Sequence, residues 1–311
     1  MDFEHPSLHS LANLQRIETF LTKGSISPVQ ALYLASQLAS QGHPATAEVI
    51  STLRNKARHR EILQTADFIE RLDEEVRRYF RLETLSADMR EVLYKRSGAT
   101  YIPSAEGSPK LLVVFSTMFN NFHISIAALL AMARSLNCNV LVLRDSSLLN
   151  FQQGVAGFAK DIPGIAAAIS AFAHRKNLSQ VYVCGYSSCG YAALMTSLLI
   201  SCSGYLGFSQ PIDMSDDAKA PPPLYFTDDV RAFVGPKHLV DLKPLLAAAD
   251  PTVPRTFVYG EKNAKDRAHA EYIQDLPQLH FIALAGVDHS TVEPFVANGK
   301  LVPLFARLLS A

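Results

Sequence analysis

Apolar residues in the first ninety positions of the chain recur three and four residues apart, as in Ala31, Ala35 and Leu38. This period is typical of amphipathic helices, because it places the apolar side chains on one face of a helix. The pattern predicts an all-helical extension over residues 1–90. Such an extension can pack as a cap on the rest of the chain, or it can serve as a separate docking module for a protein partner.

The period changes after residue 90, where short runs of Val, Leu, Ile and Tyr are separated by helical segments of ordinary length. This alternation is typical of a parallel sheet with crossover helices, so it predicts an α/β domain over residues 91–311. The predicted strands are Glu91–Tyr94, Thr100–Ile102, Leu111–Phe115, Val140–Leu143, Val181–Cys184, Tyr205–Phe208, Thr256–Tyr259 and His280–Leu284. The helices predicted between them include Ile124–Leu136, Ile165–Arg175, Gly190–Ile200 and Asp266–Leu276.

The longest connection without a clear strand covers residues 211–254 and contains the triplet Pro221, Pro222 and Pro223. Long insertions over a rigid sheet often act as lids. This segment is therefore a candidate lid insertion.

The segment from Val181 to Leu194 has the pattern of a buried strand, a tight turn that contains serine, and a helix that opens with small residues. Ser187 lies in the turn, with Gly185 two positions before it and Cys189 two positions after it. A serine on such a strained turn presents its hydroxyl above the sheet, and small neighbours allow the two backbones to approach. The segment resembles the nucleophile elbow of the α/β-hydrolase superfamily, with Cys189 where the usual pattern has its second glycine.

Ser188 is the alternative nucleophile, because Gly190 then stands two residues after it. In that register Tyr186 would crowd the first small position of the turn, so Ser187 is the preferred nucleophile. The resemblance covers residues 90–311 and implies an α/β-hydrolase fold with an eight-stranded, mostly parallel sheet flanked by helices. The string Leu143-Arg-Asp145, taken with the elbow and with Gly207–Pro211, is also similar to hydrolase-like proteins of bacterial surface-polysaccharide and glycoprotein pathways.

The resemblance implies two partners for the serine, in the chain order serine, acid, histidine. His289 follows the last predicted strand and precedes a predicted C-terminal helix, which is where the superfamily has its general base. Asp266, at the start of the helix after the strand at 256–259, is the preferred acid. Glu261 is the second choice, and Asn263 stands where the common family spacing has an aspartate.

A working site of this kind also needs N–H donors for the oxyanion of the tetrahedral intermediate. The resemblance implies one donor from the backbone of Ser188 and a second from the loop after the strand at 111–115, at Thr117 or Met118. The candidate substrate-binding residues, all near the expected edge of the sheet, are Tyr186, Arg144 and Phe119.

Composition narrows the class of partners. The 311 residues include 29 basic and 29 acidic side chains, so no net charge attracts nucleic acid or an anionic membrane. No apolar run reaches the roughly 18 residues that span a bilayer, and the N-terminus lacks a basic start followed by an apolar run. We expect a cytoplasmic protein. Its four cysteines lie in apolar contexts without a metal-site spacing, so we expect reduced thiols, no metal and no cofactor.

The expected activity follows from the resemblance. Ser187 would attack an ester or thioester carbonyl of a small-molecule or glycan-linked acyl substrate, and an acyl-enzyme would then release its acyl group to water. One alternative is an acyltransferase that uses the same three residues. The other is a non-catalytic, hydrolase-like binding or scaffold protein, which Cys189, Asn263 and the helical extension favour.

Overall fold

The chain divides into two compact units in the computed structural model: Met1–Lys95 with Ile124–Ala128, and Arg96–His123 with Leu129–Ala311. The residues that the structure describes are 50–51, 54–55, 98–117, 122–124, 126–145, 147, 149–218, 220–221, 231–232, 234–235 and 239–310. Three predictions lie outside these residues: nearly all of the helical extension, the strand at 91–94 and the protein-partner surface. The boundary at residue 90 and the partner therefore stay predictions.

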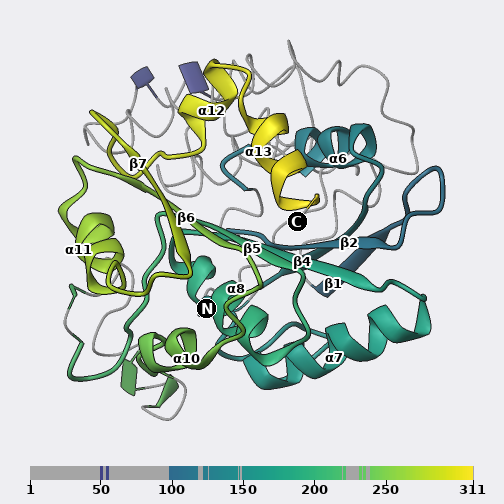
Figure 1. Cartoon of the computed structure of the whole chain (residues 1–311), viewed down its shortest axis with the longest axis horizontal. Helices are drawn as coiled ribbons and strands as arrows, with labels where there is room; N and C mark the ends of the chain where they lie inside the picture. Colours follow the sequence, from purple (N-terminus) through teal and green to yellow (C-terminus); the bar gives the residue numbers. More distant parts are fainter. Residues whose placement is uncertain are drawn as a thin grey trace. The chain divides into compact units, whose positions relative to one another are not determined.

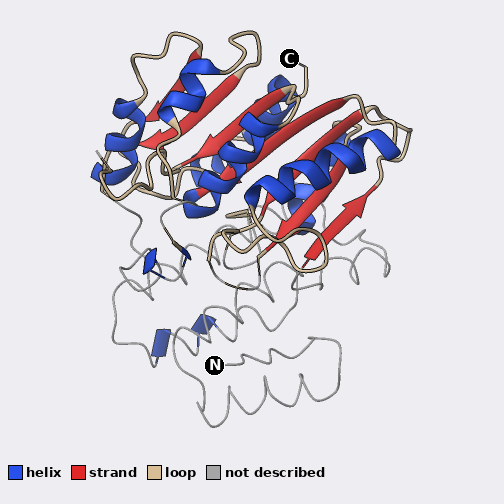
Figure 2. Ribbon diagram, turned by 90° about the horizontal axis from the view of Figure 1, so that it is seen from below, coloured by secondary structure: helices blue, strands red, loops and turns tan. Residues whose placement is uncertain are grey.

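The second unit is built on a sheet that has seven strands within the described residues, in the order β1-β3-β2-β4-β5-β6-β7. The strands are β1 (Gly98–Ile102), β2 (Lys110–Phe115), β3 (Asn139–Arg144), β4 (Gln180–Tyr186), β5 (Gly204–Phe208), β6 (Arg255–Gly260) and β7 (Leu279–Leu284). The edge strand β1 runs antiparallel to β3, and every other neighbouring pair is parallel (Figure 2). The mostly parallel α/β class is confirmed, and these strands lie within two residues of their predicted ends.

Helices cover both faces of this sheet, which explains why its central strands are continuous apolar runs. The helices are α6 (Ile126–Ser135), α7 (Ile162–Arg175), α8 (Ser187–Leu199), α10 (Lys243–Ala248), α11 (Ala264–Tyr272), α12 (Glu293–Ala297) and α13 (Leu301–Leu308). Figure 1 shows α7, α8 and α10 on one face and α12 and α13 on the other. Leu111, Val113 and Val183 of the sheet pack with Ile165 and Ile169 of α7 in one buried core.

Two helices begin earlier than predicted because a side chain caps their first turn. Asp161 precedes α7 and accepts a hydrogen bond from the backbone N of Gly164 at 2.6 Å, so this helix starts at residue 162 and not at 165. Asn263 precedes α11 and accepts from the backbone N of Lys265 and of Asp266, so this helix starts at 264 and not at 266. Side-chain acceptors at this position satisfy N–H groups that have no partner within the helix.

A third correction concerns α8, which begins at Ser187 and not at the predicted Gly190. Strand β4 runs to Tyr186, so the chain passes from strand to helix without an intervening loop. A Cβ atom on Gly185 would lie 2.5 Å from Cβ of Ala193 and 2.8 Å from Cα of Gly190. The small residues of this segment are therefore a steric requirement of the turn.

The candidate lid insertion is described over 211–218, 220–221, 231–232, 234–235 and 239–254. Its two arms meet at an isolated antiparallel bridge between Asp213 and Asp241. Tyr191 of α8 holds the second arm, because its hydroxyl bonds both the N and the O of Val240 at 2.9 Å. Whether this insertion acts as a lid stays a prediction.

All four cysteines are buried thiols. Burial raises the pKa of Cys138 and of Cys202 to about 11, which makes both thiols weak nucleophiles at neutral pH. In the described part of the chain, no group of three or more His, Cys, Asp or Glu side chains is placed to hold a metal ion. None of the helices described there combines the length and the apolar character that crossing a membrane requires.

Candidate active site

Ser187 occupies the sharp turn between β4 and α8 in a strained backbone conformation. Its φ is +53°, a left-handed value that serine seldom adopts. Its Oγ lies 2.8 Å from Nε2 of His289, a residue 102 positions further along the chain.

His289 follows β7, and its loop is fixed through the backbone carbonyl of this same residue. That carbonyl accepts hydrogen bonds from the hydroxyl of Tyr186 at 2.5 Å, from Oγ of Ser209 at 2.9 Å and from the backbone N of Thr291 at 2.8 Å. Tyr186 ends β4 and Ser209 follows β5, so the loop is tied to two points of the sheet edge. The imidazole is thereby held over the turn at Ser187.

Asp266 lies in the first turn of α11 and is only 7% exposed. Its two carboxylate oxygens lie 2.8 and 3.0 Å from Nδ1 of His289. An ionised carboxylate can only accept hydrogen bonds, so the proton of the neutral imidazole belongs on Nδ1. Nε2 then carries the lone pair that faces the hydroxyl of Ser187, which is the arrangement a general base requires.

The other two candidates for the partner of His289, Asn263 and Glu261, have different contacts. Asn263 caps α11 with its Oδ1 and donates from Nδ2 to Oδ1 of Asp288 at 2.8 Å. Glu261 is exposed, and its backbone N bonds the carbonyl of Leu284. Of the three candidates, the structure brings Asp266 to the imidazole.

Two of the predicted oxyanion donors lie in the described residues. Ser188 is buried in the first turn of α8, and its Oγ bonds Oδ1 of Asn150 at 2.7 Å. Thr117 is buried just beyond the end of β2. Met118 and Phe119 lie outside the described residues, and the oxyanion assignment stays a prediction.

Tyr186 and Arg144, which the sequence suggested as substrate-binding residues, are each 1% exposed. The hydroxyl of Tyr186 is used on the His289 loop, and Nη1 of Arg144 bonds Oγ1 of Thr100 at 2.8 Å. Both contacts tie the side chains to the fold, so a role in substrate binding stays a prediction for each.

His123 is a neighbour of the site that the sequence did not indicate. Its ring stacks on that of Tyr186, with centroids 3.8 Å apart and planes inclined by 26°. Burial lowers the pKa of His123 well below its usual range, and the proximity of His289 lowers it further. The site therefore holds a second imidazole that is neutral at physiological pH. No sequence motif marks it, because its contact with Tyr186 spans more than sixty positions.

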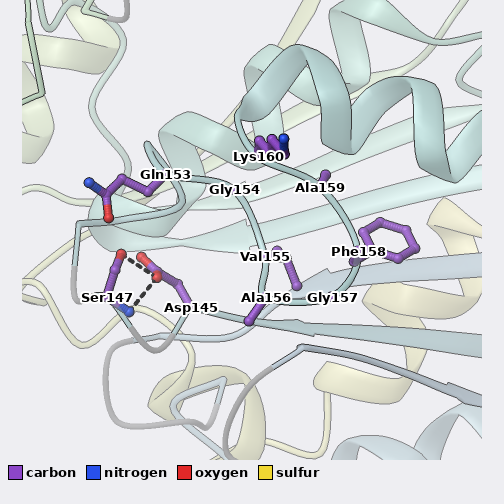
Figure 3. A pocket seen from close by; sticks show the side chains of 10 residues that line it. All are labelled: Asp145, Ser147, Gln153, Gly154, Val155, Ala156, Gly157, Phe158, Ala159 and Lys160. Atoms are coloured by element: carbon purple, nitrogen blue, oxygen red, sulfur yellow. Dashed lines mark hydrogen bonds between the residues drawn. The ribbon is translucent and has the colours of Figure 1, made fainter.

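A cavity of about 730 Å³ lies along the loop between β3 and α7, apart from the serine, histidine and aspartate (Figure 3). Its lining residues are Asp145, Ser147, Gln153, Gly154, Val155, Ala156, Gly157, Phe158, Ala159 and Lys160. The figure shows Asp145 beside Ser147. Oδ1 of Asp145 accepts hydrogen bonds from both the backbone N and Oγ of Ser147. The same loop carries Asn150, which contacts Ser188 beside the turn at Ser187. Neither Asn150 nor Ser187 lines the cavity.

The strand order, with Ser187 directly after β4, Asp266 after β6 and His289 after β7, defines an α/β-hydrolase fold within the described residues. No protein-family model and no curated protein matches the chain. Among solved structures, the chain is similar to MenH from S. aureus, with 12% identity over 68% of this chain and 99% of that one and a TM-score of 0.45.

Two further solved structures have the same degree of likeness. One is a carboxylesterase of Nitrososphaera gargenis, with 12% identity over 68% of this chain and 94% of that one and a TM-score of 0.47. The other is bromoperoxidase from Bacillus anthracis, with 11% identity over 67% and 95% of the two chains and a TM-score of 0.46. At such identities the likeness concerns the fold alone.

Proposed function

We propose that this protein is a serine hydrolase that cleaves an ester or thioester through an acyl-enzyme on Ser187. The observation that supports the proposal is the unbroken hydrogen-bond chain from Oγ of Ser187 through His289 to Asp266, with 2.8 Å at each of its two closest contacts. The start of α8, the first turn of α11 and the loop after β7 bring these three residues together in the order and geometry that activate a serine hydroxyl.

The first half of the proposed reaction forms the acyl-enzyme. Oγ of Ser187 attacks the carbonyl carbon while Nε2 of His289 takes the hydroxyl proton. The resulting oxyanion is stabilised by the backbone N–H of Ser188. When the tetrahedral intermediate collapses, the imidazolium returns its proton to the departing alcohol or thiol, and the acyl group stays on Ser187.

The second half repeats these steps with water. His289 takes a proton from water, the hydroxide attacks the acyl carbonyl, and the proton passes to Oγ of Ser187 as the carboxylic acid leaves. Asp266 keeps the imidazole in the correct tautomer and stabilises the imidazolium in both halves. Its burial strengthens this interaction, because little water competes for its oxygens.

The proposed substrate is a small-molecule or glycan-linked acyl ester or thioester. This reaction needs neither a metal nor a cofactor, because the nucleophile, the base and the oxyanion donor all belong to the chain. Tyr186 and Ser209 keep the base in place through its backbone carbonyl, so the imidazole can exchange protons without moving its loop.

The test is intact-protein mass spectrometry after treatment with a fluorophosphonate, which phosphonylates activated serines. We expect a single adduct on the wild-type protein, no adduct on Ser187→Ala, and an adduct on Ser188→Ala, which keeps its backbone N–H. Circular dichroism of each variant checks that it is folded. A well-folded wild-type protein that forms no adduct would overturn the proposal and favour a binding or scaffold protein.

A further inference from the structure

The loop between β3 and α7 carries a buried side chain, that of Asn150, which contacts the first turn of α8. Its Oδ1 accepts a hydrogen bond from Oγ of Ser188 at 2.7 Å and lies 3.5 Å from Sγ of Cys189, which also donates to it. Asn150 is 7% exposed, so water does not compete strongly for these bonds. One acceptor thus joins the two residues that directly follow Ser187.

The loop holds Asn150 in a conformation that is costly to form. Asn150 has a φ of +53° and Phe151 has a φ of +67°. Asparagine tolerates this left-handed region, whereas phenylalanine rarely adopts it, so the pair stores strain. Such strain persists only where surrounding contacts dictate the conformation.

Three contacts supply that constraint. Oδ2 of Asp145 accepts from the backbone N of Phe151 at 2.7 Å, and the backbone N of Gly154 donates to the carbonyl of Phe151 at 2.9 Å. The ring of Phe151 packs edge-on against Phe115, the last residue of β2, at 4.9 Å. The loop is therefore anchored to the end of the strand that leads into the second predicted oxyanion segment.

We propose that Asn150 is a positioning residue for the oxyanion donor, an inference that rests on the function proposed above. By holding the side chains of Ser188 and Cys189, Asn150 fixes the first turn of α8 and hence the direction of the Ser188 N–H. It acts through Ser188 and does not itself react. This role also explains why Cys189 replaces the usual second glycine, since a thiol donates to the same oxygen and a glycine has nothing to donate.

The proposal makes a kinetic prediction that a purely structural role does not. Loss of one oxyanion donor costs roughly 100- to 1,000-fold in kcat, and a misdirected donor costs a part of that. We expect Asn150→Ala to lower kcat for an acyl ester about 10- to 100-fold with little change in KM, because the donor acts on the transition state. A merely structural residue would lower the melting temperature and leave kcat of the folded fraction unchanged.

The experiment is a double-mutant cycle on the rate of fluorophosphonate labelling and on kcat. It compares the wild-type protein with Asn150→Ala, with Ser188→Ala and with the double variant. Residues that act as a unit give non-additive effects, so we expect the double variant to be no slower than the slower single variant. Gln153→Ala is the matched control, because Gln153 is an exposed amide on the same loop and lines the separate cavity.

The outcomes separate this inference from the proposed function. If the wild-type protein is not labelled at all, the proposed function fails. If the wild-type protein is labelled and Asn150→Ala is labelled at the same rate, or if the two single effects simply add, only the inference fails. If Asn150→Ala does not fold, Cys189→Gly and Ser188→Ala test the same contact from the side of α8. An unchanged labelling rate in both variants would overturn the inference about Asn150.

Discussion

Asn263 donates a hydrogen bond from Nδ2 to Oδ1 of Asp288, with 2.8 Å between the two atoms, and Asp288 directly precedes His289. Oδ1 of Asp288 also accepts from the backbone N of His289 at 2.8 Å. Asn263 therefore supports the histidine loop from the side, while the carboxylate that reaches the ring comes from Asp266, three residues later. Asn263 and Asp266 thus have separate roles, one at the histidine loop and the other at the imidazole ring.

This division predicts different results for two similar substitutions. Asp266→Asn should lower kcat by about 1,000- to 10,000-fold, because an amide no longer selects the tautomer with its proton on Nδ1 and cannot stabilise the imidazolium. Stability should change little, since Asn263 still caps α11. The measurement is steady-state hydrolysis of an acyl ester together with thermal unfolding.

Asp288→Asn is the matched control, because Asp288 contacts the backbone of His289 and not its ring. We expect it to retain most of the activity. Equal losses from both variants would mean that the charge near the loop matters and that the carboxylate on Nδ1 does not, which would contradict the role assigned to Asp266.

A second prediction concerns Gly260, the last residue of β6. A Cβ atom there would lie 2.0 Å from the carbonyl O of Asp288 and 2.6 Å from that of Val287, so Gly260→Ala must push the histidine loop away. A displacement of about 1 Å costs on the order of 100-fold in rate, and we expect a loss of that size in the labelling rate.

Gly286→Ala controls for the loss of a glycine in the same loop. Gly286 has a φ of +75° and open space around its Cβ position, so the substitution adds only backbone strain of about 1 kcal/mol. A Gly260→Ala variant that labels as fast as Gly286→Ala would show that the loop adjusts without moving the imidazole.

The strands and the elbow were predictable because local patterns carry them. Central strands such as Leu111–Phe115 are buried on both faces, so each appears as an uninterrupted apolar run. The turn at Ser187 requires small neighbours, and Gly185 and Gly190 are visible in the sequence for that reason. The start of α8 was wrong by three residues, because periodicity reports the buried face of a helix and not a strained turn that joins it directly to a strand.

The supporting residues of the site were not predictable in the same way. Asn150 contacts Ser188 across 38 positions, and nothing near Asn150 distinguishes it from an ordinary loop asparagine. His123 reaches Tyr186 only after β2 and β4 pair in the sheet. The choice among Asp266, Glu261 and Asn263 stayed open for a related reason, since the contact that distinguishes Asp266 is with His289, 23 positions away.

A third prediction follows from the burial of Arg144. It is 1% exposed, and its Nε and Nη2 have no hydrogen-bond partner among the described residues. Burial lowers the pKa of Arg144 to about 10, which corresponds to a cost on the order of 3 kcal/mol for keeping the guanidinium charged in the fold. Arg144→Met should therefore raise the free energy of unfolding, as replacement of poorly paired buried charges often does.

Arg255→Met provides the comparison for this prediction. Arg255 is also buried, but its Nη1 bonds the carbonyls of Asp250 and Val253 at 2.8 and 3.1 Å. We expect this variant to be less stable than the wild-type protein in urea unfolding. If Arg144→Met proves as destabilising as Arg255→Met, then the Arg144 guanidinium is well compensated and the cost derived from its pKa does not apply.

His269, on α11 three residues after Asp266, ties the start of the candidate lid insertion to this helix. Its Nδ1 accepts from the backbone N of Ile212 at 3.3 Å, so its proton is on Nε2, which donates to the carbonyl of Pro221 at 3.2 Å. Burial lowers the pKa of His269, and this effect outweighs the carbonyl of Pro221 and the charges of Asp266 and Asp213, which raise it. The folded protein thus holds this imidazole in its neutral form.

A lowered pKa in the folded state means that the unfolded chain binds the proton more readily, so acid should weaken this contact. The stability that neutral His269 provides is complete above the unfolded pKa of about 6.5 and is lost as the pH falls through the lower folded value. In urea unfolding at pH 7.5, we expect the free energy of unfolding of the wild-type protein to exceed that of His269→Gln by about 1 kcal/mol. This difference should shrink at pH 5, because the unfolded chain then binds the proton more readily than the folded one. A difference that stays constant between the two pH values would show that the imidazole does not titrate as the contact with Ile212 requires.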